Sequence, residues 1–213
     1  SFPTRRSSDL GKIYSTAEGE IATGYLKTIL PNEPANNSAN PVLSIRKEGN
    51  TPAWGAVFEQ YFQEIDKVKG QKGVLSVEKK LFVETNNGTN RQIRPVTPEQ
   101  PLRIGDKVIV RLTIRTDREM NYVFLKDLRA GCFEPADQLS GPESRDGIWY
   151  YRSPKDVSEN FFINRLPEGT FVLEYPVYVS RSGEYAGGIS TIQCMYAPEF
   201  VSHTAGESLR IMP

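Results

Sequence analysis

The sequence predicts an all-β protein built around an antiparallel β-sandwich. Three observations favour this fold class. Between Leu75 and Val179, apolar and polar side chains alternate in short runs, as they do in strands with one buried face. Turn residues recur roughly every ten positions, a spacing typical of sandwiches. Ten Tyr, ten Phe, 15 Pro and 17 Gly among 213 residues fit a strand-rich module with many turns.

The first third of the chain carries irregular strand signals. Residues 21–30 predict a strand that Gly24 weakens, and residues 42–45 predict a second one. Between them, residues 31–41 contain three Pro and four Asn, which together predict a loop. We therefore expect only a few strands here.

The region that follows joins this part to the rest of the chain. In residues 54–65 the apolar positions follow helical spacing, but the aromatic content favours a strand, and we expect a strand. Residues 67–73 are polar and contain two Gly, so they predict a flexible linker. The domain organisation expected from these signals is an irregular segment over residues 11–72 and a sandwich over residues 73–213.

After Gly73 the alternation becomes regular enough to assign the faces of individual strands. The inward positions expected on three strands are Leu75, Val77, Lys79, Leu81 and Val83, then Val108, Val110, Leu112 and Ile114, then Phe171, Leu173, Tyr175, Val177 and Val179. Residues 122–125 are apolar on both faces, which is typical of a central strand. The turns expected are Asn87-Gly88, residues 166–169 and Ser182-Gly183, with residues 185–195 closing the set.

We expect that the first ten residues do not belong to the protein. Residues 1–10, SFPTRRSSDL, match the translation of a common short-read sequencing adapter, and we treat them as an artefact outside fold reasoning. The true upstream sequence is then absent, and we expect the chain to be the carboxy-terminal part of a longer protein. Without Arg5, Arg6 and Asp9 the chain has 24 basic and 25 acidic side chains.

Composition narrows the function classes. A balanced charge argues against nucleic-acid binding, which needs a basic face. No apolar run approaches the roughly 20 residues of a membrane helix. No spacing of His, Cys and carboxylates is typical of a catalytic or metal site, so we predict no enzyme activity, no metal and no cofactor. Cys132 and Cys194 lie 62 positions apart, either as free thiols or as a disulfide across the sandwich.

A set of short motifs along the chain resembles the end of the bacterial alpha-2-macroglobulins. The motifs occur in the family's order from the first third of the chain to its end: Trp54-Gly55-Ala56, Gln60-Tyr61-Phe62, 75–82, Gly105-Asp106-Lys107-Val108, 117–123, Cys132-Phe133-Glu134-Pro135, 166–170, Gly183-Glu184-Tyr185 and 195–200. The resemblance covers essentially everything after residue 10. It implies that residues 11–72 are returning strands of a CUB-like domain and that residues 73–213 are the terminal macroglobulin (MG10-type) domain.

The resemblance also implies a function. Members of this family present a bait segment to endopeptidases, and bait cleavage drives a shape change that traps the protease. Many carry a Cys–Gln thioester that then acylates it. This chain has neither a bait region nor a Cys-x-x-Gln motif. The implied partners are target endopeptidases, met through the full-length protein, and its own thioester and CUB-like domains. The implied location is the cell envelope, periplasmic or at the surface, with a lipid anchor at the absent N-terminus as one form of attachment.

Met195 and Tyr196 are the sharpest site candidates. A thioester hydrolyses when water reaches it, and a flexible thioether beside an aromatic ring can cover such a bond. Through the resemblance, Met195 and Tyr196 would shield the thioester or pack between domains, and Pro198 would stiffen their loop. The alternative is that both side chains belong to the core.

Two further groups of residues compete with this hypothesis. Trp149, Tyr150 and Tyr151 form an aromatic cluster that would suit a carbohydrate platform if exposed, although packing inside the sandwich is the expected state. The alternative function is thus a stand-alone β-sandwich that binds carbohydrate or a surface protein. His203 is the only histidine, and Ser202 and Thr204 beside it supply no orienting carboxylate. We predict no catalytic or metal role for His203.

Overall fold

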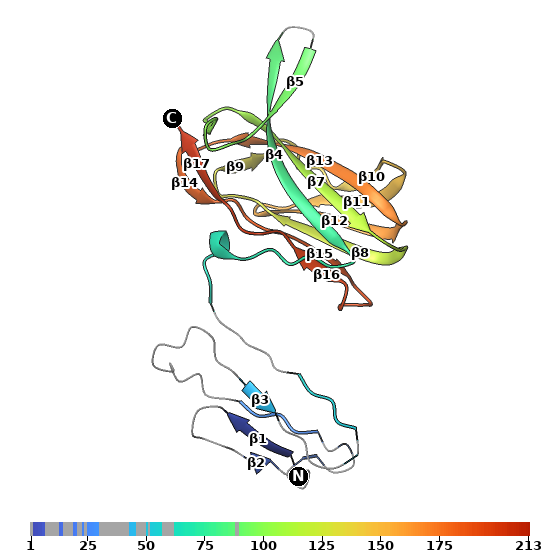
Figure 1. The fold of residues 1–213 in the computed structure, drawn as a ribbon. Coiled ribbons are helices and arrows are strands. Elements are labelled where there is room, and N and C mark those ends of the chain that lie inside the picture. Colours follow the sequence, from blue (N-terminus) through green and yellow to red (C-terminus); the bar gives the residue numbers. More distant parts are fainter. Residues whose placement is uncertain are drawn as a thin grey trace. The chain divides into compact units, whose positions relative to one another are not determined.

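The structure is a computed structural model that describes residues 2–6, 13–14, 19–20, 23, 25–29, 43–45, 50, 52–56, 62–87 and 90–213. The chain divides into two units, Ser1–Gln60 and Tyr61–Pro213, and each is described by itself (Figure 1). Within the described residues the regular structure is β, apart from one 3-10 turn, η2 (Ile65–Lys67), which confirms the all-β prediction. In the same residues no helix is long and apolar enough to cross a membrane.

The first unit contains three short strands in one antiparallel sheet. β1 (Phe2–Arg6) pairs with β2 (Ile13–Tyr14) on one side and with β3 (Leu43–Ile45) on the other. β3 confirms the strand predicted over residues 42–45. The strand predicted over residues 21–30 is wrong where the structure describes it, because residues 25–29 have no regular structure and are exposed to solvent. The side chains of residues 25–29 are not buried, and an apolar pattern alone does not stabilise a strand.

Two other expectations concern residues at the junction and before it. The loop expected over residues 31–41 lies outside the described residues. The strand expected over residues 54–65 is wrong in its described parts, since residues 54–56 and 62–64 have no regular structure and η2 begins at Ile65. The aromatic side chains Trp54 and Phe62 are both exposed, so no buried face favours a strand there. The domain identities expected for residues 1–10 and 11–72 stay predictions.

The predicted flexible linker is in fact attached to the second unit. Gln71 exchanges two backbone hydrogen bonds with His203, at 2.9 and 3.0 Å. The amide of Gly206 donates to the carbonyl of Val68 at 2.8 Å, and a Cβ on Gly206 would lie 1.9 Å from the carbonyl oxygen of Ile65. The linker prediction was wrong because polar composition gives no sign that a segment pairs with a strand 130 positions later.

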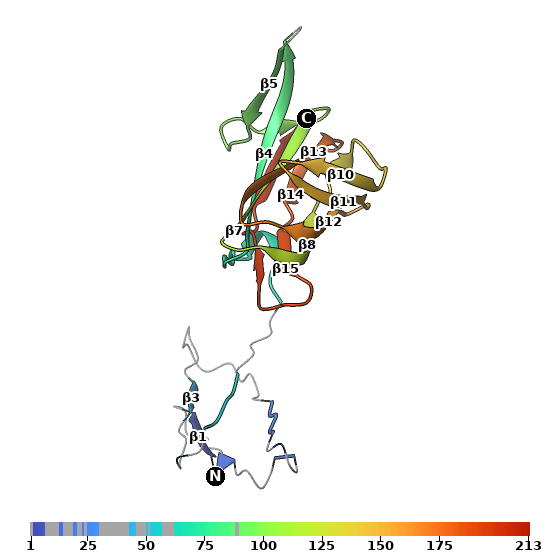
Figure 2. The same ribbon diagram turned by 90° about the vertical axis from the view of Figure 1, so that its right-hand side faces the viewer.

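Two sheets face each other in the second unit, and Figure 2 separates them. The five-stranded sheet has the order β5 (Asn90–Pro95), β4 (Ser76–Asn87), β7 (Lys107–Thr116), β13 (Gly169–Val179), β9 (Phe133–Pro135). The six-stranded sheet has the order β10 (Gly141–Arg145), β11 (Ile148–Pro154), β12 (Ser158–Leu166), β8 (Met120–Leu128), β15 (Ser190–Cys194), β16 (Val201–His203). All strand pairs in both sheets are antiparallel, which confirms the sandwich prediction.

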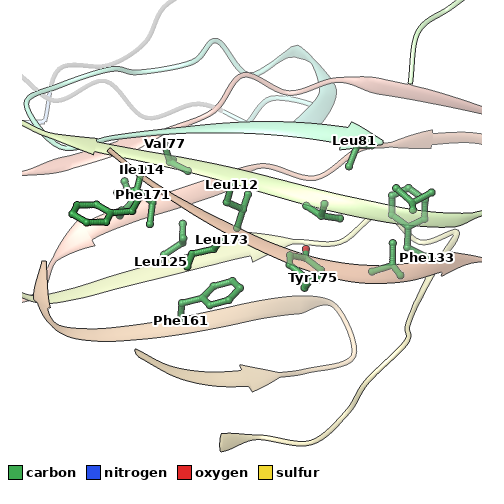
Figure 3. Close-up of a cluster of buried hydrophobic side chains, with 14 of the residues drawn as sticks. Val77, Leu81, Leu112, Ile114, Leu125, Phe133, Phe161, Phe171, Leu173 and Tyr175 are labelled. Atoms are coloured by element: carbon green, nitrogen blue, oxygen red, sulfur yellow. The ribbon is translucent and has the colours of Figure 1, made fainter. Parts of the chain in front are cut away.

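The predicted inward faces form the core. The inward apolar residues predicted on β4, β7 and β13 are all buried. In Figure 3, Leu112 and Leu173 of the five-stranded sheet face Leu125 and Phe161 of the six-stranded sheet. Residues 122–125 lie in β8, a central strand between β12 and β15, as expected. Each buried Leu or Phe side chain stabilises the fold by about 1.5–3 kcal/mol relative to an exposed one.

The turns follow the predicted positions, except that the chain also turns within residues 185–195, where one strand was expected. Asn87 pairs with Asn90, so β4 and β5 form the expected hairpin, which projects beyond the other strands of this unit in Figure 1. Its turn residues 88 and 89 lie outside the described part of the chain. β12 and β13 meet at residues 166–169, also as predicted.

The closing strand expected over residues 185–195 is instead two strands. β14 (Gly183–Ala186) joins a small third sheet with β17 (Ser208–Met212) and β6 (Leu102–Arg103), and β15 begins at Ser190. The break falls at Gly188, where φ is +73° and a Cβ would lie 2.2 Å from the carbonyl oxygen of Leu128. Only glycine fits this close approach. The pairing of β17 with β6 is parallel, an exception to the antiparallel pattern.

An ionic cluster inside the sandwich explains why Lys79 faces inward. Its ammonium group donates to Asp127 Oδ1 at 2.8 Å and to the backbone carbonyls of Leu128 and Gly187. Asp127 is fully buried and also accepts hydrogen bonds from Ser190 Oγ, at 2.7 Å, and from the hydroxyl of Tyr175. A buried charge needs such partners, and Asp127 therefore connects the two sheets through side-chain bonds.

A second buried carboxylate lies directly across the strand pair from the first. Glu159 on β12 is opposite Asp127 on β8. It accepts from Arg129 at 2.9 Å and from Arg152 at 2.7 Å. Burial raises the pKa of Glu159, and the two guanidinium groups oppose that rise. The interior thus combines an apolar core with two paired carboxylates that the sequence analysis did not identify.

Candidate functional site

Met195, Tyr196 and Pro198 lie in the loop that connects β15 to β16. The amide of Cys194 donates to the carbonyl of Phe200 at 3.0 Å, which closes the loop at its base. Phe200 in turn donates to Ala197 at 3.0 Å across a four-residue turn that has Pro198 at its second position, where the fixed φ of proline fits. The loop is therefore held by its own hydrogen bonds.

The two apolar side chains of this loop point into solvent. Met195 is 55% exposed and Tyr196 is 80% exposed. They are not part of the core, so the core alternative weighed for these residues is wrong in this unit. The amide of Met195 donates to the carbonyl of Tyr122 on β8 at 2.9 Å. The rings of Tyr122 and Tyr196 meet edge to face, with centroids 5.2 Å apart and an interplanar angle of 83°.

The loop continues into an aromatic surface on the outer side of the six-stranded sheet. Tyr151, Phe162 and Phe124 stand opposite one another on three neighbouring strands. The rings of Phe124 and Phe162 stack with centroids 4.9 Å apart. We call this surface the aromatic face; its members are Tyr122, Phe124, Trp149, Tyr151, Phe162, Met195 and Tyr196. All but Phe124 are exposed, which is unusual for adjacent large apolar side chains.

The aromatic cluster on β11 is divided between the two sides of the sheet. Trp149 and Tyr151 are exposed on the aromatic face, whereas Tyr150 is buried and donates to Glu143 Oε2 at 3.0 Å. The expectation that the whole cluster packs inside is therefore wrong for Trp149 and Tyr151, because successive residues of a strand point to opposite faces. A carbohydrate platform that includes Tyr150 is excluded for the same reason.

The outer face of the five-stranded sheet has a different chemistry. Glu174 on β13 accepts from Arg111 at 2.6 Å and from Arg145 at 2.9 Å. Lys107 donates to Glu84 at 3.0 Å. The charged side chains on this face pair with one another, and Arg145 joins them from β10 of the other sheet.

The remaining candidates do not form a reactive centre among the described residues. Cys132 and Cys194 are free and buried, which removes the disulfide alternative; Cys194 Sγ lies 3.2 Å from the carbonyl oxygen of Asn121. His203 Nδ1 contacts the carbonyl of Thr204 at 3.1 Å, and Ser202 is buried on the opposite side of β16. No group of three His, Cys, Asp or Glu side chains within the described part of the chain could hold a metal ion.

The comparison with protein families gives the sandwich an identity. The family model of the bacterial alpha-2-macroglobulin MG10 domain matches residues 75–199. This chain belongs to the bacterial alpha-2-macroglobulin family. The matched residues include β4 to β15 and extend through Met195, Tyr196 and Pro198. The resemblance inferred from the sequence motifs is therefore confirmed.

Solved structures of alpha-2-macroglobulins have the same fold in this region. Salmonella alpha-2-macroglobulin that was reacted with methylamine aligns with a TM-score of 0.54 and 21% identity, over 68% of this chain and 10% of that one. Native Escherichia coli alpha-2-macroglobulin from domain MG7 to the C-terminus aligns with a TM-score of 0.53 and 16% identity, over 68% of this chain and 24% of that one. At these identities the likeness concerns the fold alone.

One curated protein also matches part of the chain. Circularly permutated Ras protein 2 of Dictyostelium discoideum is 28% identical over 109 residues, which are 51% of this chain and 3% of that protein. The chain thus spans about a tenth of the length of the first solved alpha-2-macroglobulin and far less of the curated relative. The activity of the whole protein is therefore a matter for proposal.

Three features of the alpha-2-macroglobulin sandwich were missed by sequence reasoning. Tyr122 was assigned only to a central strand, although its ring contacts the Met195–Tyr196 loop. Trp149 and Tyr151 could have been assigned to the outer face, because alternation along β11 separates them from Tyr150. Asp127 carried no signal, since a buried carboxylate is recognised only from its partners.

Proposed function

We propose that this chain is the carboxy-terminal part of a bacterial protease inhibitor and that Met195 and Tyr196 cap a thioester held by a neighbouring domain of the full-length protein. The observation that carries the proposal is the exposure of both side chains in a loop that is closed by its own hydrogen bonds. Exposed apolar groups on a rigid loop are suited to cover a partner surface.

The chemistry of a cap is simple. A thioester carbonyl is attacked by water or by an amine, so the bond survives only where solvent is excluded. A thioether and an aromatic ring supply apolar cover without a competing nucleophile. The relatives offer support: the Salmonella protein was crystallised after reaction with methylamine, and an Escherichia coli alpha-2-macroglobulin has been solved after activation by porcine elastase. By this analogy the partners of the full-length protein are endopeptidases and its location is the cell envelope.

The experiment measures methylamine reactivity of the full-length protein. Methylamine forms an amide bond to the glutamyl carbonyl, the carbon–sulfur bond breaks, and the proton passes to the sulfur as a free thiol that a chromogenic disulfide reports. We expect the double variant Met195→Ala, Tyr196→Ala to react on the order of tenfold faster, a barrier lower by about 1.4 kcal/mol.

A matched control separates the cap from a general loss of apolar surface. Tyr178 is exposed on the outer face of the five-stranded sheet, so Tyr178→Ala removes a comparable ring far from the loop. It should leave the rate of thiol release unchanged. Equal rates in the double variant and the parent protein, or no thiol release at all, would overturn the cap.

A second candidate function is favoured by Trp149 and Tyr151, which are exposed side by side on the aromatic face. Flat aromatic rings with polar neighbours can bind the apolar face of a sugar. If the module binds carbohydrate, soluble oligosaccharides of the cell wall should change the tryptophan fluorescence of this chain. The change should be lost in Trp149→Ala, which leaves Trp54 as the remaining tryptophan.

A further inference from the structure

We infer that Tyr122 is the positioning residue of the Met195–Tyr196 loop: its strained backbone and its ring together fix where the two exposed side chains point. The inference rests on the proposed function and adds the residue that sets the geometry of the cap.

The backbone of Tyr122 is strained. Its φ is +56°, in the left-handed region that bulky side chains seldom adopt. Asp146 is the other described non-glycine residue with positive φ, and it lies with Gly147 in the tight turn between β10 and β11, where such values are ordinary. Tyr122 instead lies inside a nine-residue strand. Strain of this kind persists where surrounding contacts impose it, and it accumulates at functional sites.

The strand pairing of β8 is interrupted at Tyr122 on one side and ends beside it on the other. Toward β12, Val123 pairs with Ile163 and Asn121 with Arg165, and the pairing skips Tyr122 between them. Toward β15, the last strand pair joins Val123 to Cys194, and the next position carries the 2.9 Å hydrogen bond from the Met195 amide to the Tyr122 carbonyl. Tyr122 therefore holds the first residue of the loop at the point where the strand ends.

The side chain of Tyr122 holds the second residue of the loop. Its ring meets the ring of Tyr196 edge to face, the geometry that aromatic pairs prefer. Because φ sets the direction in which the Cα–Cβ bond leaves the strand, a residue with negative φ at this position would direct its side chain away from Tyr196. The left-handed backbone thus directs the ring toward Tyr196.

Three substitutions in this chain separate the backbone from the ring. Tyr122→Phe keeps the ring, Tyr122→Ala removes it and keeps the strain, and Tyr122→Gly removes both. In the Tyr122→Ala and Tyr122→Gly variants we expect the Met195 amide to exchange its hydrogen about tenfold faster, because the loop loses its ring contact. The Phe variant should keep the exchange rate and the nuclear Overhauser contacts between rings 122 and 196. Since glycine tolerates positive φ, the Tyr122→Gly variant should unfold at a higher denaturant concentration than the Tyr122→Ala variant.

The control is Tyr151→Ala, which removes an exposed ring from the same face without touching the loop. If Tyr122→Ala leaves the Met195 exchange rate and the resonances of Tyr196 as they are, the inference is overturned. Because these measurements involve no thioester, they decide the positioning role separately from the cap. In the full-length protein, Tyr122→Ala should also accelerate the release of the thiol by methylamine. The Tyr122→Phe variant should react at the slow rate of the parent protein. Acceleration by Met195→Ala, Tyr196→Ala with an unchanged Tyr122→Ala would retain the cap and remove the positioning role.

Discussion

The two outer faces of the sandwich share one interior but differ in what they present to solvent. On the five-stranded sheet, Arg111 and Glu174 form an ion pair across the neighbouring strands β7 and β13, and Arg145 of β10 forms a second ion pair with Glu174. On the six-stranded sheet the corresponding positions carry Tyr151, Phe162 and Phe124. Both sheets follow the same period-2 alternation. The difference shows that alternation fixes which residues point outward but leaves the chemistry of those residues open.

The charged groups of the five-stranded sheet are paired with one another, whereas the apolar rings of the aromatic face stay exposed to water. An ion pair on a sheet surface satisfies its own groups and stays hydrated. Adjacent exposed rings leave apolar surface in water, which favours burial against another surface. The aromatic face also includes the Met195–Tyr196 loop, so the exposed apolar side chains of both lie together.

The largest expected effect tests the side-chain link between the sheets that carry these faces. Asp127→Ala leaves the Lys79 ammonium, whose side chain is 10% exposed, without its carboxylate partner. Removing one member of a buried ion pair costs about 3–5 kcal/mol of unfolding free energy. Urea denaturation followed by circular dichroism measures the loss.

A double variant serves as the control for the buried pair. Asp127→Leu with Lys79→Met removes both charges and should be less destabilised than Asp127→Ala alone. If the single and double variants unfold at the same urea concentration, the Lys79–Asp127 ion pair does not account for the side-chain connection between the two sheets.

The next effect tests whether the core excludes water, unlike the two outer faces of the sandwich. Burial raises the pKa of Cys132 from 9.0 to about 11. The folded state then keeps a proton that the unfolded state loses, so this stability is complete below pH 9 and is lost as the pH rises toward 11. The loss amounts to about 2–3 kcal/mol over that window. Cys132→Ala should flatten this part of the stability–pH curve, measured by denaturation at fixed pH values. An unchanged slope would mean that other groups, such as Tyr150, dominate it.

The smallest effects compare the faces directly. A double-mutant cycle on Phe124 and Phe162 should give a coupling energy of about 0.5–1.5 kcal/mol that does not depend on salt. The same cycle on Arg111 and Glu174 should give about 0.2–1 kcal/mol and fall in 1 M NaCl, where the screening length is roughly 3 Å. If both couplings respond equally to salt, the two faces do not differ in the way described above.

Much of the fold could be predicted because each strand of the sandwich carries its own pattern. The inward positions of β4, β7 and β13 follow from alternation within a single strand, and the turn at residues 166–169 follows from its Pro and Gly. Residues 67–73 could not be predicted, because their hydrogen bonds go to His203 and Gly206, far along the chain. Polar composition there describes solubility and says nothing of partners.

The candidate site divides in the same way. Met195, Tyr196 and Pro198 were singled out through the family resemblance, and their exposure agrees with a contact role. Tyr122 carried no such signal, because its positive φ and its contact with Tyr196 arise from β8 and β15 lying side by side. A strand pattern records burial, not the backbone angle of one residue.

The amino-acid sequence by itself determined the all-β class, the faces of the main strands and the membership in the alpha-2-macroglobulin family, because these depend on local alternation, turns and collinear motifs. The tertiary structure decided that Asp127 and Lys79 meet inside the sandwich, that Trp149 and Tyr151 join Tyr196 on one face, and that Tyr122 holds the loop. These features depend on strand order and register, and residues brought together across a sheet are not neighbours in any local pattern.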